Sequence, residues 1–472
     1  MKKKILKYGF WSLILCVTSQ FAGAQSIART AYFMDNATHR HLMNPALTPT
    51  QGYFSLPIVG EFSLGVESNM AFTDFIYPAV TPGGELLSFL SPDVDATDFL
   101  SRIDPNNFLR MDVRTSILSL GFYSGTDFWT FDVASRVNMS LNLPYDLFAF
   151  AKIGKANSEN EYHLDNLSIE AGAFAEVALG YSRNIMNNLR VGGKIKYLAG
   201  GANIKACLKN MDIYMSDAAW TVTTEGQMDV YGKGLTFQKD EDQNINGVNM
   251  ETSGMGGSGM AIDLGVTYSP IRNLDISAAI VDLGSIKWKK DNILQASSSG
   301  TTTYTGLENI SIQDENEDES NSTENQLEEL KDDLIEMANF KEQAVTRDYK
   351  QKLYPTINAG AEYSMLKDKL SIGVLYTTRM MEDENYSELM GALNLRPSKW
   401  FNLSGSYSFM HGKGETLGFA VGFVPGIINI FMACDYTFLK VTPQYIPLNT
   451  MTSNFQLGLS IPLGMGHLPD KH

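Results

Sequence analysis

Apolar and polar residues alternate along most of the chain with a period of two. Between residues 129 and 143, Trp129, Phe131 and Val133 fall on one face, while Thr130 and Asp132 fall on the other. Side chains of a β-strand point alternately to its two faces, so the pattern predicts a strand with one apolar and one polar face. The stretch is longer than a typical soluble strand of about five or six residues.

The same pattern recurs in later segments, which end with residues 453–464. Residues 168–183 and 188–201 form the clearest pair, joined by a short turn. Their polar faces carry opposite charges, which we expect to pair across the hairpin. These charged residues are Glu170 and Glu176 in the first segment and Arg190, Lys194 and Lys196 in the second.

Short and long connections between the predicted strands alternate. Short ones lie near Gly125, Asn187, Ile271, Lys367, Pro397 and Gly426, and long ones start near Asn69, Leu143, Ile204, Lys289, Met381, Gly412 and Lys440. A transmembrane barrel places short turns at one end and long loops at the other, with an even number of strands. The sequence therefore predicts an all-β, antiparallel transmembrane barrel of about fourteen strands, or sixteen if residues 213–232 cross as a hairpin.

The first residues are typical of a secretory leader. Lys2, Lys3 and Lys4 precede an apolar run from Phe10 to Val17, and small residues follow up to Ala24. This order predicts cleavage after Ala24. The apolar run is shorter than the roughly 18 residues that a membrane helix needs. The large Leu15 before Cys16 argues against a lipoprotein signal.

Charge and cysteine content exclude some classes of protein. The chain has 37 basic and 53 acidic residues, a net charge of −16, and the leader carries lysines but no acids. Such a chain has no basic patch for nucleic acid, so no nucleic-acid partner is expected. Cys207 and Cys434 lie far apart after the leader, and we expect them to be isolated thiols.

The predicted inward faces hold a set of charged residues. We interpret them as lumen-lining side chains that pair with one another, with water or with a plug, and the alternative is that some line a solute path. The set is Asp132, Arg136, Glu170, Glu176, Arg190, Lys194, Lys196, Asp263, Glu362 and Arg379. Small inward residues leave room that water, ligand or chain must fill. They are Gly360, Gly373, Gly418, Ala420, Gly422 and Gly458.

Residues 301–350 depart from the alternating pattern. Their central part, "QDENEDESNSTENQ", is acidic and low in complexity, which is typical of a solvated segment. Leu327, Leu330, Leu334 and Met337 then recur at helical spacing, so we expect a short amphipathic helix on the barrel mouth. The carboxylates lack the ligand spacing and turn glycine of a calcium loop.

Motifs for catalysis or metal binding are weak. His39 and His41 form a His-x-His pair, which in an exposed, flexible segment is usually incidental. Residues 254–259, "GMGGSG", lack the Lys-Ser/Thr end of a phosphate loop. No Gly-x-Ser-x-Gly elbow occurs. We therefore predict no catalytic residues, no metal site and no cofactor, and a protein that is not an enzyme.

An Asn-Pro turn lies near the start of the expected mature chain. Asn44, Pro45 and Ala46 follow the turn residues Asp35, Asn36 and Ala37, and the strand from Tyr53 comes next. This arrangement resembles the long-chain fatty-acid transporter family of outer-membrane barrels, the FadL-like proteins. The block "IDLGVTYSPIRNLDISAAIVDLGSIKWKK" is similar to an uncharacterised branch of such barrels. The resemblance implies a fourteen-stranded barrel with an N-terminal plug that bears the Asn-Pro-Ala motif.

The predicted organisation has four parts. They are a signal peptide (1–24), a plug segment (25–52), a barrel (53–463) with the acidic loop 288–353, and a C-terminal tail (464–472). The resemblance implies uptake of hydrophobic molecules through a path that the plug opens.

Three functional hypotheses follow. The first is a barrel in the outer membrane of a Gram-negative cell that binds or passes small hydrophobic solutes. The second is a non-transporting scaffold for secreted or surface proteins. The third, a soluble secreted β protein, would leave its apolar outward faces as one very large exposed patch. The expected partners are outer-membrane lipids, a hydrophobic small molecule, and a secreted or surface protein.

Overall fold

The computed structural model describes most of the expected mature chain. The described residues are 27–464, except 58, 78–86, 155–159, 217–218, 241–242, 253, 305–333, 336, 381–385, 411–412 and 437–451. The predictions for the leader, for most of the acidic segment and for the tail after residue 464 concern residues outside this description.

The described residues form a closed antiparallel barrel of fourteen strands, as the alternating pattern predicts. Each strand pairs with the next one in the chain, and β24 closes the barrel against both β1 and β2. The strands are β1 (Gly52–Ser55) continued by β2 (Phe62–Ser68), β5 (Asn106–Ser124), β6 (Asp127–Pro144), β8 (Leu167–Met186), β9 (Leu189–Met215), β13 (Gly257–Ile271), β14 (Leu274–Trp288), β18 (Thr356–Met365), β19 (Leu370–Arg379), β20 (Tyr386–Ser398), β21 (Phe401–Met410), β22 (Lys413–Phe423), β23 (Asn429–Tyr436) and β24 (Thr452–Leu463).

The outer face of the barrel is an apolar belt. On β19, Ile372, Val374 and Tyr376 are exposed, while the alternate residues Ser371 and Gly373 point inward. Exposed aromatic side chains lie at two levels. Tyr268, Tyr363, Trp400 and Phe423 lie near the short turns, and Tyr197, Tyr376, Tyr407 and Phe409 lie further along their strands. An apolar band between aromatic girdles is the outer surface of a transmembrane barrel.

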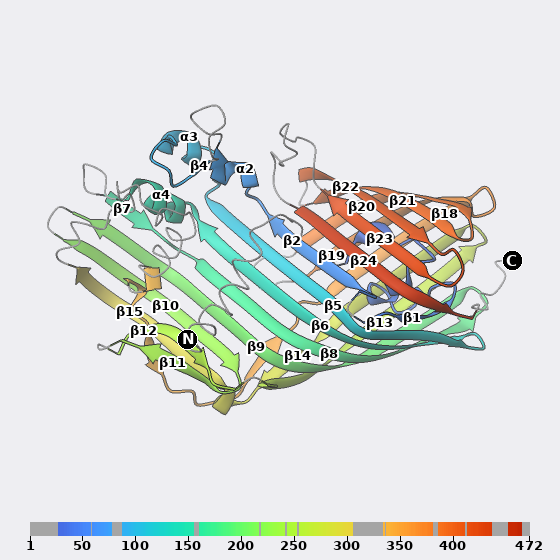
Figure 1. Cartoon of the computed structure of the whole chain (residues 1–472), viewed down its shortest axis with the longest axis horizontal. Coiled ribbons are helices and arrows are strands. Elements are labelled where there is room, and N and C mark those ends of the chain that lie inside the picture. The colour runs from blue at the N-terminus through green and yellow to red at the C-terminus, as the bar shows by residue number, and fades with distance from the viewer. Residues whose placement is uncertain are drawn as a thin grey trace.

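The wall of the barrel is unequal in height. Strands β5, β6, β8 and β9 have 18 to 27 residues, whereas β18, β19, β21 and β23 have 8 to 10. Figure 1 shows the long strands continuing past the shorter wall toward the long-loop end. This extension carries the further strands β7 (Asn160–His163), β10 (Trp220–Gly232), β15 (Ile293–Tyr304), β16 (Lys341–Gln343) and β17 (Tyr349–Lys352).

Residues 213–232 do not add two spanning strands. β10 pairs with the far half of β9, residues 202–215, and with β15, while β13 pairs with the near half of β9. The hairpin therefore lengthens the wall beyond the membrane band, and the strand count stays at fourteen. A separate small hairpin, β11 (Leu235–Lys239) with β12 (Ile245–Met250), follows it.

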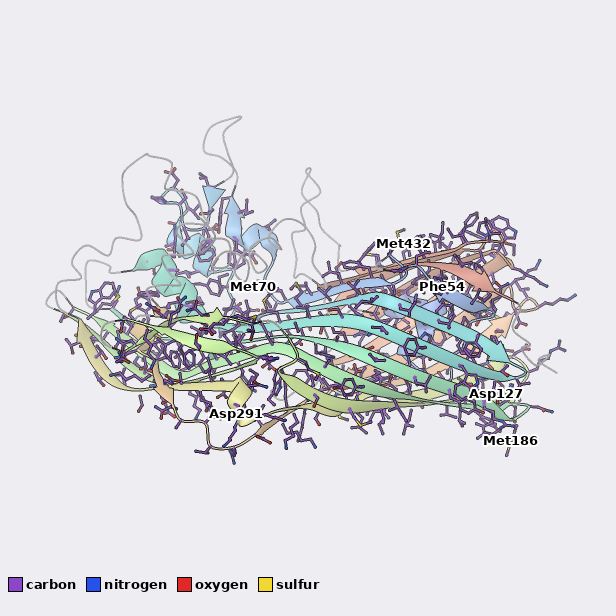
Figure 2. All side chains as sticks on the ribbon, turned by 60° about the horizontal axis from the view of Figure 1, so that its bottom comes forward. Phe54, Met70, Asp127, Met186, Asp291 and Met432 are labelled. Atoms are coloured by element: carbon purple, nitrogen blue, oxygen red, sulfur yellow. The ribbon has the colours of Figure 1, made fainter. Side chains whose placement is uncertain are left out.

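A folded head lies at the long-loop end. It contains α2 (Phe72–Phe75), α3 (Ala96–Leu100), α4 (Tyr145–Ile153) and the short pair β3 (Ile76–Tyr77) and β4 (Leu87–Ser88). Its apolar core joins Phe99 and Phe148 to Met211 and Trp220 of the wall extension. Figure 2 shows Met70 at the base of this head, with Asp127 and Met186 at the opposite, short-turn end.

The predicted loop helix falls partly within the described residues. Residues 334–335 and 337–338 are helical, and Met337, Ala338 and Phe340 are buried in the head core. Leu327 and Leu330 lie outside the description. A short 3-10 turn, η3 (Lys290–Asn292), precedes β15.

The N-terminal segment, residues 27–50, lies inside the short-turn half of the barrel, and we call it the plug (Figure 1). It contains two 3-10 turns, η1 (Arg29–Ala31) and η2 (Thr38–Leu42), and most of its residues are buried. Tyr32, Phe33 and Met34 form an apolar core with inward residues of the shorter wall, such as Leu375 and Phe431. The plug therefore fills the lumen as a packed core does.

Candidate functional site in the plugged lumen

The Asn-Pro-Ala motif makes a tight turn against two glycines of the wall. Asn44 Oδ1 accepts from the backbone N–H of Ala46 at 2.9 Å, and the Leu47 N–H donates to the Asn44 carbonyl at 2.8 Å. A Cβ on Gly192 would lie 2.4 Å from the Pro45 carbonyl, and one on Gly265 would lie 2.0 Å from Asn44 Oδ1. Only glycine leaves room for this turn at the wall.

Backbone carbonyls of the plug are held by polar side chains of the wall. Arg396 Nη2 donates to the Phe33 carbonyl at 2.8 Å, Asn429 Nδ2 to the Asn36 carbonyl at 2.9 Å, and Asn358 Nδ2 to the Met43 carbonyl at 2.8 Å. These bonds satisfy carbonyl groups that have no sheet partner inside the barrel.

The start of the plug carries a buried ion pair. Arg29 and Glu388 are in direct contact, and their side chains are 3% and 2% exposed. Asp435 accepts from the Arg29 backbone N–H at 2.7 Å and from the Thr30 hydroxyl. Two acidic wall residues therefore fix the entrance of the plug chain.

The plug occupies the room left by small inward residues. A Cβ on Gly373 would lie 2.5 Å from the ring of Phe33, and Cβ atoms on Gly418 and Gly422 would overlap Thr30 and Asn36. The sequence left open whether water, a ligand or the chain itself fills this room. At these positions it is filled by the plug chain.

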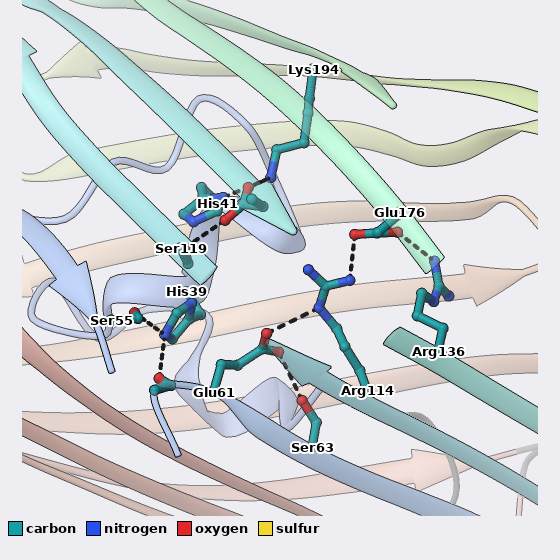
Figure 3. A network of polar contacts seen from close by, with 12 residues as sticks. His39, His41, Ser55, Glu61, Ser63, Arg114, Ser119, Arg136, Glu176 and Lys194 are labelled. Carbon is teal, nitrogen blue, oxygen red and sulfur yellow. Dashed lines mark hydrogen bonds and ion pairs between the residues drawn. The ribbon is translucent and has the colours of Figure 1, made fainter. Parts of the chain in front are cut away.

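His41 of the plug belongs to a closed ring of hydrogen bonds, of which Figure 3 shows the part around Lys194. Lys194 Nζ donates to His41 Nδ1 at 2.9 Å and to Asp132 at 2.8 Å. His41 Nε2 donates to the Tyr53 hydroxyl at 2.6 Å, Tyr53 to Ser119 at 3.1 Å, and Ser119 to Asp132 at 2.5 Å. A ring nitrogen that accepts from an ammonium group carries no proton, so His41 is neutral here.

The expectation of an exposed, flexible His-x-His pair is wrong. His39 and His41 are 2% and 1% exposed, because the plug folds inside the barrel. His39 Nε2 contacts the Gly60 carbonyl at 2.8 Å and Ser55 at 3.3 Å. Within the described residues, no cluster of three or more His, Cys, Asp or Glu side chains is placed to hold a metal ion.

An ion-pair network crosses the lumen next to this ring, on its side toward the mouth (Figure 3). Arg114 Nε contacts Glu61 at 3.1 Å, and Arg114 Nη1 contacts Glu176. Arg136 Nη1 lies 3.5 Å from Glu176 and 2.8 Å from Asp282. Each buried charge thus has an opposite charge beside it, which offsets the cost of its desolvation.

The network continues to the next strands through Lys196. Its ammonium group lies 2.8 Å from Asp263 and 2.6 Å from Asp282. The Asp282 backbone N–H donates to Asp263 at 2.8 Å, across a bulge where Asp263 faces both Val281 and Asp282. Asp282 has φ +61°, which turns its side chain into the lumen beside that of Val281.

The ten predicted lumen residues fall into several groups. One network contains Arg136, Glu176, Lys196 and Asp263, and Lys194 with Asp132 forms the ring below it. Arg379 pairs with Asp112, and Glu170 accepts from Tyr354 at 2.9 Å near the mouth. The other two lie near the short turns, where Arg190 donates to the Thr126 carbonyl at 3.1 Å and Glu362 pairs with Arg396 at 2.6 Å.

The expected pairing across the hairpin of β8 and β9 is wrong. Glu176 lies opposite Leu198 in register, and its ion-pair partners are Arg114 and Arg136 from β5 and β6. Lys194 and Lys196 reach across the lumen or to β13 and β14 instead. Inward side chains of other strands are also within reach, so Glu176 pairs with Arg136 of its other neighbour β6 and with Arg114 of the more distant β5.

Sequence reasoning missed three members of the network. Strict alternation places Asp282 on the face opposite Val281, and only the bulge brings both inward. Glu61 lies in the interruption between β1 and β2, where no strand period applies. Arg114 carries an available signal, because it follows Asp112 and Arg110 at period two on β5.

Two adjoining cavities lie in the lumen above the plug. They share Asp112, Arg136, Asp282 and Arg379 in their linings. The lower one reaches Ile27, Leu42 and Met43 of the plug. The upper one reaches Trp288 and Tyr354 toward the mouth.

The strand pairing, the apolar belt and the plug define a plugged transmembrane β-barrel. None of the helices in the described part of the chain is long and apolar enough to cross a membrane. The chain belongs to a family of unknown function, DUF5723, whose model matches residues 45–435. No curated protein gave a significant match.

Several solved barrels are similar to the chain at low identity. The toluene transporter TbuX of Ralstonia pickettii is 9% identical, with 94% of this chain and 96% of that one covered and a TM-score of 0.41. The toluene transporter TodX of Pseudomonas putida is 8% identical, with 94% and 99% covered and a TM-score of 0.40. A FadL homologue of Pseudomonas aeruginosa is 9% identical, with 94% and 98% covered and a TM-score of 0.37. The strand pairing, not these likenesses, defines the fold.

Proposed function

We propose that the protein is an outer-membrane barrel that binds small solutes at its long-loop mouth and passes them when its plug moves. The apolar belt with two aromatic levels supports a place in the membrane. The observation that carries the proposal is the pair of adjoining cavities, which lead from Trp288 and Tyr354 down to Ile27 and Met43 of the plug. A solute entering from the mouth meets the plug at the end of this path.

The plug controls passage in this proposal. The buried pair of Arg29 and Glu388 and the ring around His41 hold it in the lumen at rest. The resemblance seen in the sequence favours hydrophobic solutes, and the plug offers Ile27, Leu42 and Met43 as an apolar surface to them. The charged groups above the plug give the same path a polar side.

A disulfide lock tests the gate. The hydroxyl oxygens of Thr30 and Ser406 are 2.5 Å apart, so Thr30→Cys with Ser406→Cys places two thiols within bonding reach. Neither Cys207 nor Cys434 forms a disulfide, and both are replaced by Ser in this background. The measurements are swelling of proteoliposomes in arabinose and entry of the apolar dye phenylnaphthylamine into cells that express the protein.

The proposal expects passage of at least one probe in the reduced form and loss of it in the oxidised form. The two single-cysteine variants control for the oxidant and should not respond. Equal passage in the locked and reduced forms would contradict gating by the plug.

The folded head favours a second function, a scaffold for secreted or surface proteins. Its own apolar core, with Phe99 and Phe148 packed on the wall extension, makes it a rigid platform outside the membrane band. Isolation of the detergent-extracted protein with a stoichiometric protein partner, together with absence of solute passage, would favour this function over the first.

A further inference from the structure

The short turns, at the end of the barrel that holds the plug, carry large apolar residues. In five of the six short turns of the described chain, such a residue lies in the turn or directly beside it. Ile427 is 87% exposed and Leu366 is 71% exposed, more than Val374 of the apolar belt at 49%. The others are Ile185, Met186, Ile271 and Trp400, and Figure 2 shows Met186 at this end. Exposed apolar residues gathered at one end of a molecule are typical of a binding surface.

Leu366 is held in an unfavourable backbone conformation. Together with Lys367 and Asp368 it turns the chain from β18 to β19, and the three residues have φ +52°, +57° and +65°. A positive φ is sterically costly for a bulky side chain, and glycine or asparagine adopts it more easily. The exposed Leu366 side chain gains little packing within the protein in return. A leucine in this turn therefore indicates a contact outside the chain.

The same turns are basic, although the chain as a whole has a net charge of −16. Their fully exposed charged residues are five bases and one acid, Asp368. The bases are Arg183, Arg272, Lys367, Lys369 and Lys399. The partly exposed acids nearby have partners within the chain, namely Asp127 with Arg183, Asp35 with Arg40 and Asp275 with Ser269. The surface of these turns therefore attracts anions.

The aromatic residues beside the turns indicate the level at which the bases lie. Trp400 and Tyr268 belong to the aromatic level near the short turns, and such rings lie at the headgroups of a membrane. Lys399 is next to Trp400, and Arg272 follows Tyr268 by four residues. A strand rises about 3.4 Å per residue, so these bases lie close to the headgroup layer.

The turns are also distributed around the barrel. They come from hairpins that follow one another along the closed wall, from β8 and β9 to β22 and β23. A membrane surrounds a barrel on all sides, whereas a protein partner docks on one side of it. The distribution therefore favours a lipid surface over a protein.

We propose that the apolar and basic residues of these turns, which we call the short-turn rim, bind the headgroup layer of a membrane that contains anionic phospholipids. The apolar side chains insert between the headgroups, and the bases bind the phosphate groups. Each Lys or Arg near an anionic surface adds to the binding, so an anionic lipid is favoured over a neutral one. The inference rests on the proposed place in the outer membrane and names the lipid that holds the plug end of the barrel.

The test is urea unfolding of the intact protein in two kinds of vesicle, one of phosphatidylcholine alone and one of phosphatidylcholine mixed with phosphatidylglycerol. Heat-modified migration in gels measures the folded fraction. The inference expects a more stable barrel in the mixed vesicles, and loss of this gain at high salt, because salt screens the attraction. Equal stability of the unmodified protein in the two kinds of vesicle would overturn the inference.

A triple substitution tests the bases of the rim. Arg272→Gln, Lys367→Gln and Lys399→Gln together should remove most of the gain, since each base lost lowers the lipid-dependent rise in the folding equilibrium constant roughly fivefold. The matched control replaces three exposed bases of the head and the wall extension, and it should keep the gain. It combines Arg102→Gln, Lys209→Gln and Lys341→Gln. Equal losses in the two triple variants would overturn the role of the rim.

Leu366→Gly separates lipid contact from structural support. Glycine adopts the positive φ of this turn without steric cost, so the variant should be at least as stable as the unmodified protein in detergent. In vesicles it should be less stable than the unmodified protein, because the apolar contact with the headgroup layer is lost. A change of the same sign in detergent and in vesicles would contradict insertion of Leu366.

The two proposals fail separately. Passage that responds to the plug lock without any preference for phosphatidylglycerol would overturn the lipid contact and leave the gated barrel in place. A preference for phosphatidylglycerol without solute passage would support the rim and contradict transport. Loss of a co-isolated protein from the rim variant, with no response to the lipid, would assign the rim to a protein partner and overturn the inference.

Discussion

Gly192 on β9 lies directly opposite Gly265 on β13, and the Asn44–Pro45 turn of the plug sits against both. A side chain at either position would overlap the turn. The pairing of two glycines on adjacent strands therefore creates the seat of the plug, and it explains how a chain turn without a sheet partner fits between inward-facing side chains.

The seat predicts that alanine substitutions at two neighbouring glycines have different effects on solute entry. Gly192→Ala places a Cβ 2.4 Å from the Pro45 backbone, whereas the nearest atom to a Cβ at Gly193 is 3.7 Å away. We expect Gly192→Ala to displace the plug and to raise arabinose entry in a proteoliposome swelling assay. Gly193→Ala should match the unmodified protein, and equal rates for the two variants would count against the seat.

The ring around His41 predicts that a single substitution lowers stability more than a matched double substitution does. Lys194→Met leaves the buried Asp132 carboxylate without its cation, which typically costs about 3–5 kcal/mol of unfolding free energy. Adding Asp132→Leu removes the unpaired charge and should recover part of that loss. Urea unfolding of the three proteins in detergent measures this. A double variant less stable than Lys194→Met would refute the pairing.

The same ring predicts sensitivity to acid. Burial, and next the Lys194 ammonium, hold the pKa of His41 well below its usual 6.5. Between pH 6.5 and that lowered value the unfolded chain binds a proton that the folded plug does not, so stability is lost as the pH falls through this range.

We therefore expect arabinose leak to rise below about pH 6.5 in the unmodified protein. His41→Gln cannot be protonated and should show a smaller rise. A leak that stays constant between about pH 8 and pH 5 would contradict this role of His41.

The apolar belt predicts a cost for charge on the outer face. Along the barrel axis, Val374 lies between the heights of Tyr363 and Tyr376. Its side chain is 49% exposed. Val374→Arg should lower the unfolding free energy in lipid by roughly 2–4 kcal/mol. Val374→Leu is the control and should change it little. If the arginine variant were as stable as the leucine variant, this face would not contact lipid.

The alternation of apolar and polar residues was sufficient to predict the strands of the barrel wall. Residues such as Ile372 and Val374 alternate with Ser371 and Gly373 without interruption, so each strand and its outward face follow from the sequence. The alternation of short and long connections left fourteen or sixteen strands, and the structure has fourteen because residues 213–232 return along β9 rather than crossing.

The partners of the charged lumen residues did not follow from the sequence. They depend on distances across the lumen and on breaks in alternation, as the bulge at Asp282 and the interruption at Glu61 show. The burial of His39 and His41 depends on the plug folding inward, which a local pattern of residues does not encode.

Closure of the lumen by the plug is tested most directly by the conductance of the protein in planar lipid bilayers, measured with and without residues 27–50. The full-length protein should conduct little at neutral pH and the shortened barrel far more, since the plug fills the short-turn half of the lumen. Equal conductance of the two proteins, both shown to form the barrel by heat-modified migration, would contradict a lumen closed by the plug.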